Sequence, residues 1–271
     1  MKTRIIAAVI LLPLLLLVVL VLPKIFTAVL FGMMAAIAAR ELLTGTGLVK
    51  HPRLITYAMV MAFFVPVWSS MQMVYSLVLF GALVFFIALF GELLYSRATL
   101  KFEEMAVTVV AGILVPFLFG ATIRLHSQTY GRLLILLPFV IAFLSDTGAY
   151  FVGCAFGKHK LAPIISPKKT VEGLFGGVLG AVIGVIIYCV VLQKVWNLEV
   201  RYLYVVVYGI LGSLGAVFGD LCFSAVKRQT GIKDYGNLIP GHGGILDRFD
   251  SMIVVAPLVE LLMLYIPLVV I

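Results

Sequence analysis

The sequence predicts an all-α membrane protein, a polytopic bundle of about nine transmembrane helices with its N-terminus in the cytoplasm and its C-terminus outside. Three observations support this class. Hydrophobic residues make up 63% of the 271 residues and charged residues only 12%, roughly half the charge of a soluble domain. Apolar stretches of about 18 residues, enough to cross a bilayer core, recur along the whole chain. Basic residues gather in alternate loops.

Hydropathy divides the chain into candidate spans separated by short polar segments. Their approximate bounds are 5–22, 24–43, 54–70, 73–95, 105–123, 132–152, 171–192, 202–227 and 250–270. The first is longer than the core of a signal peptide and lacks a small-residue cleavage site, so we interpret it as a retained helix. No polar stretch suffices for a separate soluble domain. Residues 1–271 therefore form one membrane domain, with N-terminal helices in 1–140 and the candidate site in 141–271.

The distribution of basic residues sets the expected orientation. Fifteen of the 20 Lys and Arg residues fall in loops on the N-terminal side of the membrane. Cytoplasmic loops are enriched in these residues, so the N-terminal side is assigned to the cytoplasm, across the inner membrane of a cell. The net charge of +8 then reflects topology and does not indicate a nucleic-acid partner. Two of these loops, residues 153–170 and 228–250, also hold most of the polar patterning.

Two carboxylates lie within apolar runs, Asp146 in the sixth span and Asp220 in the eighth. An ionisable side chain in a membrane helix costs about 2.5–3.5 kcal/mol on insertion scales, so each needs a partner or a function. Asp220, Ser224 and Lys227 share one helix face. That pattern fits a structural Asp–Lys pair as well as a functional site.

Asp247 and Asp250 add two carboxylates, one helical turn apart at the expected start of the last span. Three or more acids at one membrane depth would repel each other, and a divalent cation with oxygen ligands removes that repulsion. Mg²⁺ commonly takes one or two carboxylates together with phosphate oxygens. The pattern therefore predicts a Mg²⁺ site, and it leaves open whether a second cation binds.

The two polar loops also suggest a phosphate site. Three glycines in four positions, ending at Gly243 and Gly244, let backbone N–H groups approach an anion before a helix N-terminus. An ordinary flexible turn is the alternative. In the other loop, Lys168 and Lys169 either anchor the topology or face a polyphosphate, and Thr170 is expected to cap the seventh span.

Other features need no functional role. Gly173 and the glycines of residues 176–184 predict close packing between helices. Glu41, Glu92 and Glu260 lie near predicted helix ends, where snorkelling or ion pairing explains them as well as function does. The three cysteines lie in or beside apolar runs and are expected to be inert thiols.

The C-terminal half carries two long motifs. The longer motif reads Ser224-Ala225-Val226-Lys227-Arg228-x4-Lys233-Asp234-x-Gly236-x2-Ile239-Pro240-x-His242-Gly243-Gly244-Ile245-x-Asp247-Arg248-Phe249-Asp250. The second runs from Ser145-Asp146-Thr147-Gly148-Ala149-Tyr150 to Ser166-Pro167-Lys168-Lys169-Thr170-x-Glu172-Gly173. Both motifs resemble those of the phosphatidate cytidylyltransferase (CDP-diacylglycerol synthase) family. One departure is Phe223, where many members of the family have Glu before the Ser. The first 140 residues resemble the family only in hydropathy.

The resemblance implies that a cytidylyl group passes from CTP to phosphatidic acid, giving CDP-diacylglycerol and pyrophosphate. It implies that Asp220 and Asp247 hold Mg²⁺, with Asp250 as a further ligand. The catalytic set adds the basic residues Lys227, Arg228, Lys233 and Arg248, which would stabilise charge on the transferring group and on pyrophosphate. The expected substrate-binding residues are Asp146, Lys168, Lys169, Ser224, His242, Gly243 and Gly244. The expected partners are CTP, phosphatidic acid and the bilayer; a homodimer is left open.

Two other functions would use similar residues. A CTP-dependent lipid kinase would transfer the γ-phosphate and release CDP, but the complete longer motif argues against it. A transporter of anionic substrates would carry its polar residues near mid-membrane, in two related halves. No such repeat is visible, because the polar motifs gather in one half of the chain.

Overall fold

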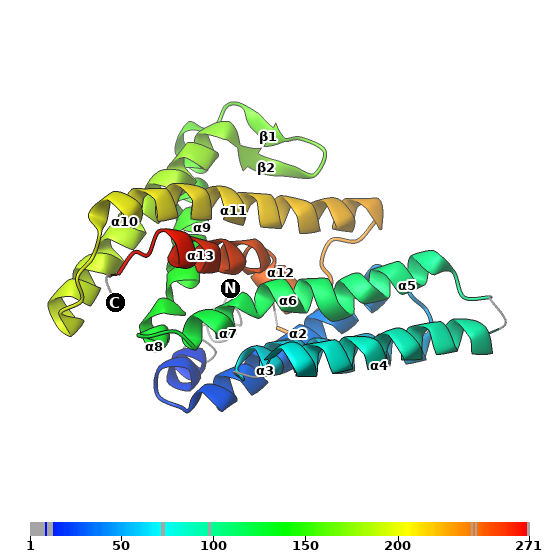
Figure 1. Cartoon of the computed structure of the whole chain (residues 1–271). Helices are drawn as coiled ribbons and strands as arrows, with labels where there is room; N and C mark the ends of the chain where they lie inside the picture. Colours follow the sequence, from blue (N-terminus) through cyan, green and yellow to red (C-terminus); the bar gives the residue numbers. More distant parts are fainter. Residues whose placement is uncertain are drawn as a thin grey trace. The chain divides into compact units, whose positions relative to one another are not determined.

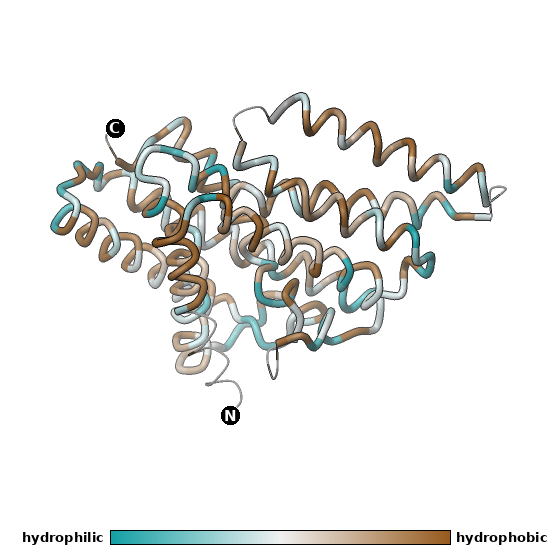
Figure 2. Tube along the Cα trace, turned by 90° about the horizontal axis from the view of Figure 1, so that it is seen from below, coloured by the Kyte–Doolittle hydropathy of each residue, from teal (hydrophilic) through white to brown (hydrophobic). Residues whose placement is uncertain are grey.

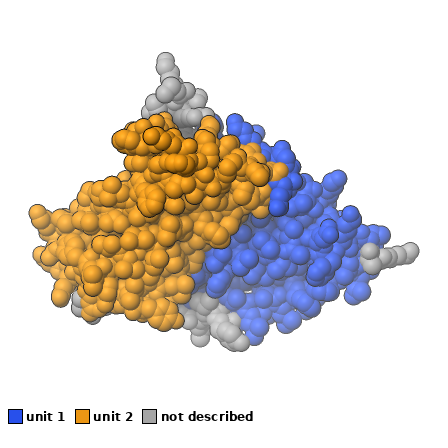
Figure 3. Space-filling model, turned by 90° about the horizontal axis from the view of Figure 1, so that it is seen from above, with its two compact units in different colours: residues 1–127, 229–249 blue, residues 128–228, 250–271 orange. Residues whose placement is uncertain are grey.

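The computed structural model describes residues 9, 13–71, 74–96, 99–239, 241 and 243–269. These residues are mostly helical and include one two-stranded sheet (Figure 1). They belong to two compact units. Unit 1 comprises Met1–Ser127 and Gln229–Phe249, and unit 2 comprises Gln128–Arg228 and Asp250–Ile271 (Figure 3). Each unit therefore combines segments that are distant in the sequence.

Seven helical segments of the described chain are long and apolar enough to cross a membrane. They are Lys24–Gly45, Pro52–Ser69, Ser76–Tyr95, Phe102–His126, Gly131–Phe156, Val171–Trp196 and Tyr202–Gln229. Hydrophobic residues predominate along these helices, as the brown colour in Figure 2 shows. The chain is therefore a helical membrane protein, and the seven segments match the second to eighth predicted spans.

The first and last predicted spans are not confirmed by the described residues. The first, residues 5–22, falls largely outside the described residues, although residues 13–20 are helical. Within the last, residues 250–270, the only long helix is α13 (Met252–Tyr265), which has 14 residues. At 1.5 Å per residue it is about 21 Å long, shorter than a bilayer core of about 30 Å. Nine spans therefore stays a prediction.

Unit 1 contains most of the N-terminal helices. They are α2 (Lys24–Gly45), α3 (Pro52–Ser69), α4 (Val74–Tyr95), α5 (Phe102–Val109), η1 (Val110–Leu114), α6 (Val115–Phe119) and α7 (Ala121–His126), and α12 (Leu246–Phe249) joins them from the far end of the chain. The fifth predicted span is not one regular helix, because η1 is a π-helical turn. Pro116 explains this: it lacks an N–H and crowds the carbonyl four residues earlier, so the helix widens.

The core of unit 1 forms where α2 meets its neighbours. The rings of Phe31 and Phe119 stack with centroids 5.1 Å apart. A Cβ at Gly32 would lie 2.6 Å from the Phe63 carbonyl oxygen, so the glycine allows α2 and α3 to touch through their backbones. At the ends of α3 and α4, Arg53 binds the buried Glu92 with Nη1 3.1 Å from Oε1. Ion pairing therefore accounts for Glu92.

Unit 2 contains α8 (Gly131–Leu134), α9 (Leu137–Phe156), α10 (Val171–Trp196), α11 (Tyr202–Gln229) and α13. The packing of α9 on α10 depends on glycines: a Cβ at Gly148 would meet the backbone of Gly176 and Gly180. Close packing by these glycines was predicted and is confirmed. The Thr170 hydroxyl accepts the Gly173 N–H at 3.1 Å and so caps α10, also as expected.

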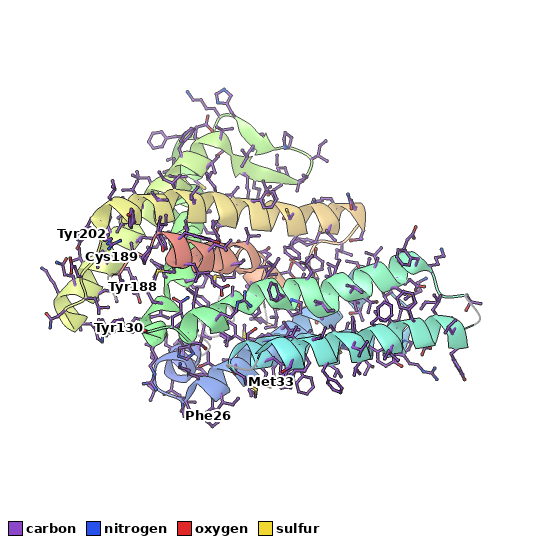
Figure 4. All side chains as sticks on the ribbon, viewed as in Figure 1. Phe26, Met33, Tyr130, Tyr188, Cys189 and Tyr202 are labelled. Carbon is purple, nitrogen blue, oxygen red and sulfur yellow. The ribbon has the colours of Figure 1, made fainter. Side chains whose placement is uncertain are left out.

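The far end of α10 is fixed by tyrosines. The Tyr188 hydroxyl donates to the Leu133 carbonyl at 2.7 Å, and the Tyr202 hydroxyl donates to Gln193 Oε1 at 2.7 Å. Figure 4 labels Tyr188 and Tyr202 together with Cys189, which is fully buried. Burial was expected of all three cysteines and is wrong for Cys154 and Cys222, which are exposed. The tyrosine bonds hold together the helix ends of unit 2 that lie away from its polar loop.

A β-hairpin occupies the polar loop between α9 and α10, where the sequence predicted no strand. Strands β1 (Lys160–Ala162) and β2 (Ser166–Thr170) pair antiparallel, with Lys160 opposite Thr170. The Glu172 carboxylate fixes the base of the hairpin, because it accepts the backbone N–H groups of Lys158 and His159. The fold is thus not purely α-helical, because the loop between α9 and α10 forms backbone hydrogen bonds between two short strands.

Candidate active site

Asp220 lies on α11 and is neutralised from the hairpin. The Lys169 ammonium on β2 lies 2.6 Å from Asp220 Oδ2. One turn along α11, the Ser224 hydroxyl donates to Asp220 Oδ1 at 2.9 Å. The predicted helix face therefore exists, and an ammonium ion from a distant loop completes it. The side chains are 22% exposed for Lys169 and 28% exposed for Asp220, but the Lys169 Nζ itself is buried.

Asp250 is the most buried acid of unit 2, with 8% of its surface exposed, and lies between α12 and α13. Burial first, and then the charge of Asp220, raise the pKa of Asp250 from 3.8 to about 7. Asp146 raises this pKa further, whereas Lys227 lowers it. Three carboxylates from α9, α11 and the start of the last segment therefore act on each other electrostatically.

Gly219 brings α11 close to Asp250. A Cβ at Gly219 would lie 2.8 Å from the Asp250 carbonyl oxygen and 3.1 Å from the Ser251 Cα. No larger residue fits there without moving the backbone. Because Gly219 immediately precedes Asp220, this contact fixes the position of one carboxylate relative to the other.

A cavity of about 440 Å³ opens beside Asp146, between α9, α10 and the hairpin. Its charged side chains are Asp146, Lys160, Lys168 and Lys169, and its apolar ones include Leu161, Leu174 and Val217. The Lys169 ammonium is engaged by Asp220, so Lys160 and Lys168 against Asp146 leave a net positive charge, which favours an anionic group in the cavity. Asp146 lies further from its helix end than expected, because α9 continues to Phe156.

The two basic residues at the end of α11 also belong to unit 2. The Arg228 Nε donates to the Ile165 carbonyl in the hairpin turn at 3.1 Å. Lys227 interacts electrostatically with Asp250. Unit 2 thus contains Asp146, Lys168, Lys169, Asp220, Ser224, Lys227, Arg228 and Asp250.

The glycine-rich segment lies in unit 1, and Asp247 organises it. Asp247 Oδ2 accepts the Tyr235 N–H at 2.8 Å and the Gly244 N–H at 3.0 Å, and the Asp247 side chain is buried. Gly241 and Gly243 have φ values of +77° and +86°, in the left-handed region that favours glycine. The segment is therefore an ordered turn closed by a carboxylate.

The remaining predicted residues of this segment are exposed or not described. Lys233 and Arg248 are exposed on unit 1 and available to an anionic ligand. His242 lies outside the described residues. Unit 1 thus holds Lys233, Gly243, Gly244, Asp247 and Arg248.

One sequence expectation about the acids is wrong. Asp247 and Asp250 do not lie on one helix at the start of the last span. Asp247 belongs to α12, which ends at Phe249, and α13 begins only at Met252. Asp250 and Ser251 form a turn between the two helices, and the Ser251 N–H donates to Asp250 Oδ1 at 2.7 Å.

The acids of unit 2 suit Mg²⁺ in chemistry, because carboxylate oxygens are the ligands that this cation prefers and Asp220 and Asp250 repel each other. In the described chain, no group of three or more His, Cys, Asp or Glu side chains is already arranged around a common point. Lys169 holds Asp220 instead. A cation at Asp220 would therefore have to displace the Lys169 ammonium.

Sequence reasoning missed two residues that shape these sites. Glu41 was placed at a helix end, yet it accepts hydrogen bonds from Ile245 and Leu246 beside Asp247. Gly219 was not singled out, although it packs on Asp250. An acid inside an apolar run was the available signal for Glu41. Nothing local marked Gly219, because its partner lies on another element.

The fold and these two sites define a helical membrane protein that presents carboxylates and basic residues for a phosphate-transfer reaction. A sequence profile of the cytidylyltransferase family matches residues 2–266. This chain belongs to that family and is a membrane cytidylyltransferase.

Three relatives named phosphatidate cytidylyltransferase illustrate the match. The protein of Bacillus subtilis (strain 168) is 39% identical over 184 residues, which are 65% of this chain and 67% of its own. That of Staphylococcus epidermidis (strain ATCC 12228 / FDA PCI 1200) is 43% identical over 139 residues, 51% and 52% of the two chains. That of Staphylococcus aureus (strain COL) is 37% identical over 269 residues, 97% of each.

Stability should depend on pH through Asp250. Its raised pKa means that the folded state favours the neutral acid, so this contribution to stability is lost as pH rises through about 7. Between pH 6 and 8, wild type should lose about 1.4 kcal/mol from this group. Asp250→Asn should remove that loss in thermal unfolding measured in detergent with EDTA. The exposed Glu199→Gln is the control, and an unchanged pH slope in Asp250→Asn would contradict the assignment.

Gly219→Ala should lower cytidylyltransferase activity by about tenfold or more, because its Cβ forces α11 away from Asp250 and misplaces Asp220. Steady-state rates in mixed micelles measure this. Gly91→Ala is the matched control, since nothing lies within 4 Å of a Cβ at that helical glycine. Equal rates in the two variants would show that the close contact at Gly219 is dispensable.

Proposed function

We propose that this chain transfers the cytidylyl group of CTP to phosphatidic acid, giving CDP-diacylglycerol and pyrophosphate. The observation that carries the proposal is the family match across residues 2–266, with relatives named for this activity. The cationic cavity beside Asp146 supports it, because both substrates are anionic.

In the reaction, an oxygen of the lipid phosphate forms a bond to the α-phosphorus of CTP. The bond from that phosphorus to the bridging oxygen of the β-phosphate breaks, and pyrophosphate leaves. A phosphate monoester is already ionised at neutral pH, so no protein group needs to remove a proton from the attacking oxygen. The task of the protein is to hold two anions together and to stabilise the charge that develops.

Basic residues from both motifs perform that task. Lys168 and Lys169 bind substrate phosphate in the cavity of unit 2, and Ser224 binds it beside Asp220. Lys227 and Arg228 stabilise charge on the transferring group. In the glycine-rich segment, His242 and Gly243 bind phosphate, assisted by Lys233 and Arg248. Gly244 joins them by exchanging its N–H bond to Asp247 for one to phosphate. Asp146 orients the substrate and limits the positive charge of the cavity.

The proposed ligands of Mg²⁺ are Asp220, Asp247 and Asp250. The same acids could hold one cation or two. Carboxylate oxygens suit the ion, and only two residues stand between Asp247 and Asp250 in the sequence. When bound, Mg²⁺ would neutralise the triphosphate and act as a Lewis acid at the transferring phosphorus. The chain's part is to supply oxygen ligands and to release Lys169 from Asp220.

We place the protein in the inner membrane with nine spans, the N-terminus and both polar loops in the cytoplasm and the C-terminus outside. The bias of Lys and Arg toward one set of loops supports this orientation. CTP is soluble and the lipid phosphate lies at headgroup level, so a site at that boundary can reach both. A homodimer stays a hypothesis.

The activity is tested with purified full-length chain, Mg²⁺, phosphatidic acid and α-labelled CTP. Label should appear in the lipid, with one pyrophosphate released per lipid formed. A lipid kinase would instead leave the label in CDP, and that result would refute the proposal. Omitting phosphatidic acid is the control for hydrolysis of CTP.

Asp220→Asn and Asp247→Asn should each lower kcat by about 100-fold or more, because each removes a charged ligand worth several kcal/mol in the transition state. Both variants should elute as folded protein in detergent. Glu199→Gln changes an exposed acid that precedes the start of α11, and controls for the loss of one charge. Retention of wild-type kcat in either Asp variant would remove that residue from the proposed metal site.

A further inference from the structure

Glu41 is a buried acid on α2 whose two carboxylate oxygens bind a segment about 200 residues away. Oε1 accepts the Ile245 N–H at 3.1 Å, and Oε2 accepts the Leu246 N–H at 2.9 Å. The residue is 7% exposed and lies within a candidate membrane span. A carboxylate in such surroundings is costly unless its charge is satisfied, and charge-assisted hydrogen bonds of this kind are strong.

The segment is shaped to receive this carboxylate. A Cβ at Gly236 would lie 2.5 Å from Glu41 Oε1, and a Cβ at Gly244 would collide with Oε2. One turn further along α2, Gly45 packs on the carbonyl oxygen of Tyr235. Glycines on both sides therefore let the segment wrap closely around the end of α2.

The same segment carries Asp247. Asp247 accepts the N–H groups of Tyr235 and Gly244, and the residue before it, Leu246, donates its own N–H to Glu41. Two carboxylates thus bind backbone N–H groups of the same turn. Asp247 belongs to the segment itself, whereas Glu41 belongs to α2. Any shift of Glu41 must move the backbone immediately before Asp247.

We propose that Glu41 is a positioning residue of the active site, which fixes residues 235–236 and 244–247 so that Asp247 meets the substrates in one geometry. The inference rests on the proposed cytidylyl transfer. Glu41 itself touches neither substrate: it acts through the backbone of Ile245 and Leu246. Displacements of about 1 Å at such a site cost up to roughly 100-fold in rate.

Glu41→Gln is the direct test, because it keeps the shape and volume but places an NH2 group against one backbone N–H. We expect kcat to fall at least tenfold and the Mg²⁺ concentration for half-maximal activity to rise. Without metal, in EDTA, hydrogen exchange at Ile245 and Leu246 should become faster, and the midpoint of thermal unfolding should also fall, because two hydrogen bonds to a buried carboxylate are weakened. Glu41→Asp keeps the charge but shortens the side chain, and its activity should fall between wild type and Glu41→Gln.

Glu92→Gln is the matched control, since Glu92 is an equally buried acid of unit 1 and its partner is Arg53. It should lower the midpoint of thermal unfolding but leave kcat, the Mg²⁺ requirement and exchange at Ile245 within about twofold of wild type. If Glu41→Gln behaves like Glu92→Gln, Glu41 serves only stability and the inference is overturned.

Gly236→Ala keeps the test decisive if Glu41→Gln does not fold. Its Cβ pushes the segment off an intact Glu41, so kcat should fall and exchange at Leu246 should rise in the same way. Wild-type kcat in Gly236→Ala would overturn the inference. An inactive wild-type chain in the labelled-CTP assay would instead refute the proposed function, so the two failures are distinguishable.

Discussion

Each negative charge on or beside an apolar helix must be satisfied locally, and this requirement organises both units. Water is scarce there, so an unpaired carboxylate would cost several kcal/mol. The chain uses three solutions. The first is an ion pair, as between Arg53 and Glu92 or Lys169 and Asp220. The second is hydrogen bonding from backbone N–H groups, as at Glu41 and Asp247. The third is protonation: burial raises the pKa of Asp250 to about 7, which favours its neutral form.

Glycine allows these pairs to form, because backbones can approach only where side chains are absent. Gly148 and Gly176 bring α9 against α10, which supports the hairpin that carries Lys169. Gly219 brings α11 against Asp250, and Gly244 admits the Glu41 carboxylate. The high glycine content of the polar motifs therefore serves close packing between elements as much as contact with a phosphate.

Local patterns predicted what depends on neighbouring residues along the chain. The bond from Ser224 to Asp220, the Thr170 cap and the glycine contacts of α10 all follow from helix periodicity or capping rules. The hairpin was missed because an alternation over so few residues resembles a loop. The helix break between Asp247 and Asp250 was missed because both acids fit one helical turn, and nothing in the local sequence marks the end of α12 at Phe249.

The sequence by itself determined the helical membrane class, the spans with long apolar runs, and the family through its two motifs, because hydropathy and motif spacing are local properties of the chain. Tertiary structure decided which groups form ion pairs or hydrogen bonds with each buried charge. Glu41 lies 204 residues from Ile245, and Lys169 and Asp220 come from different elements. Such pairs form only when helices pack, since the free energy that joins them comes from burial and not from proximity in sequence.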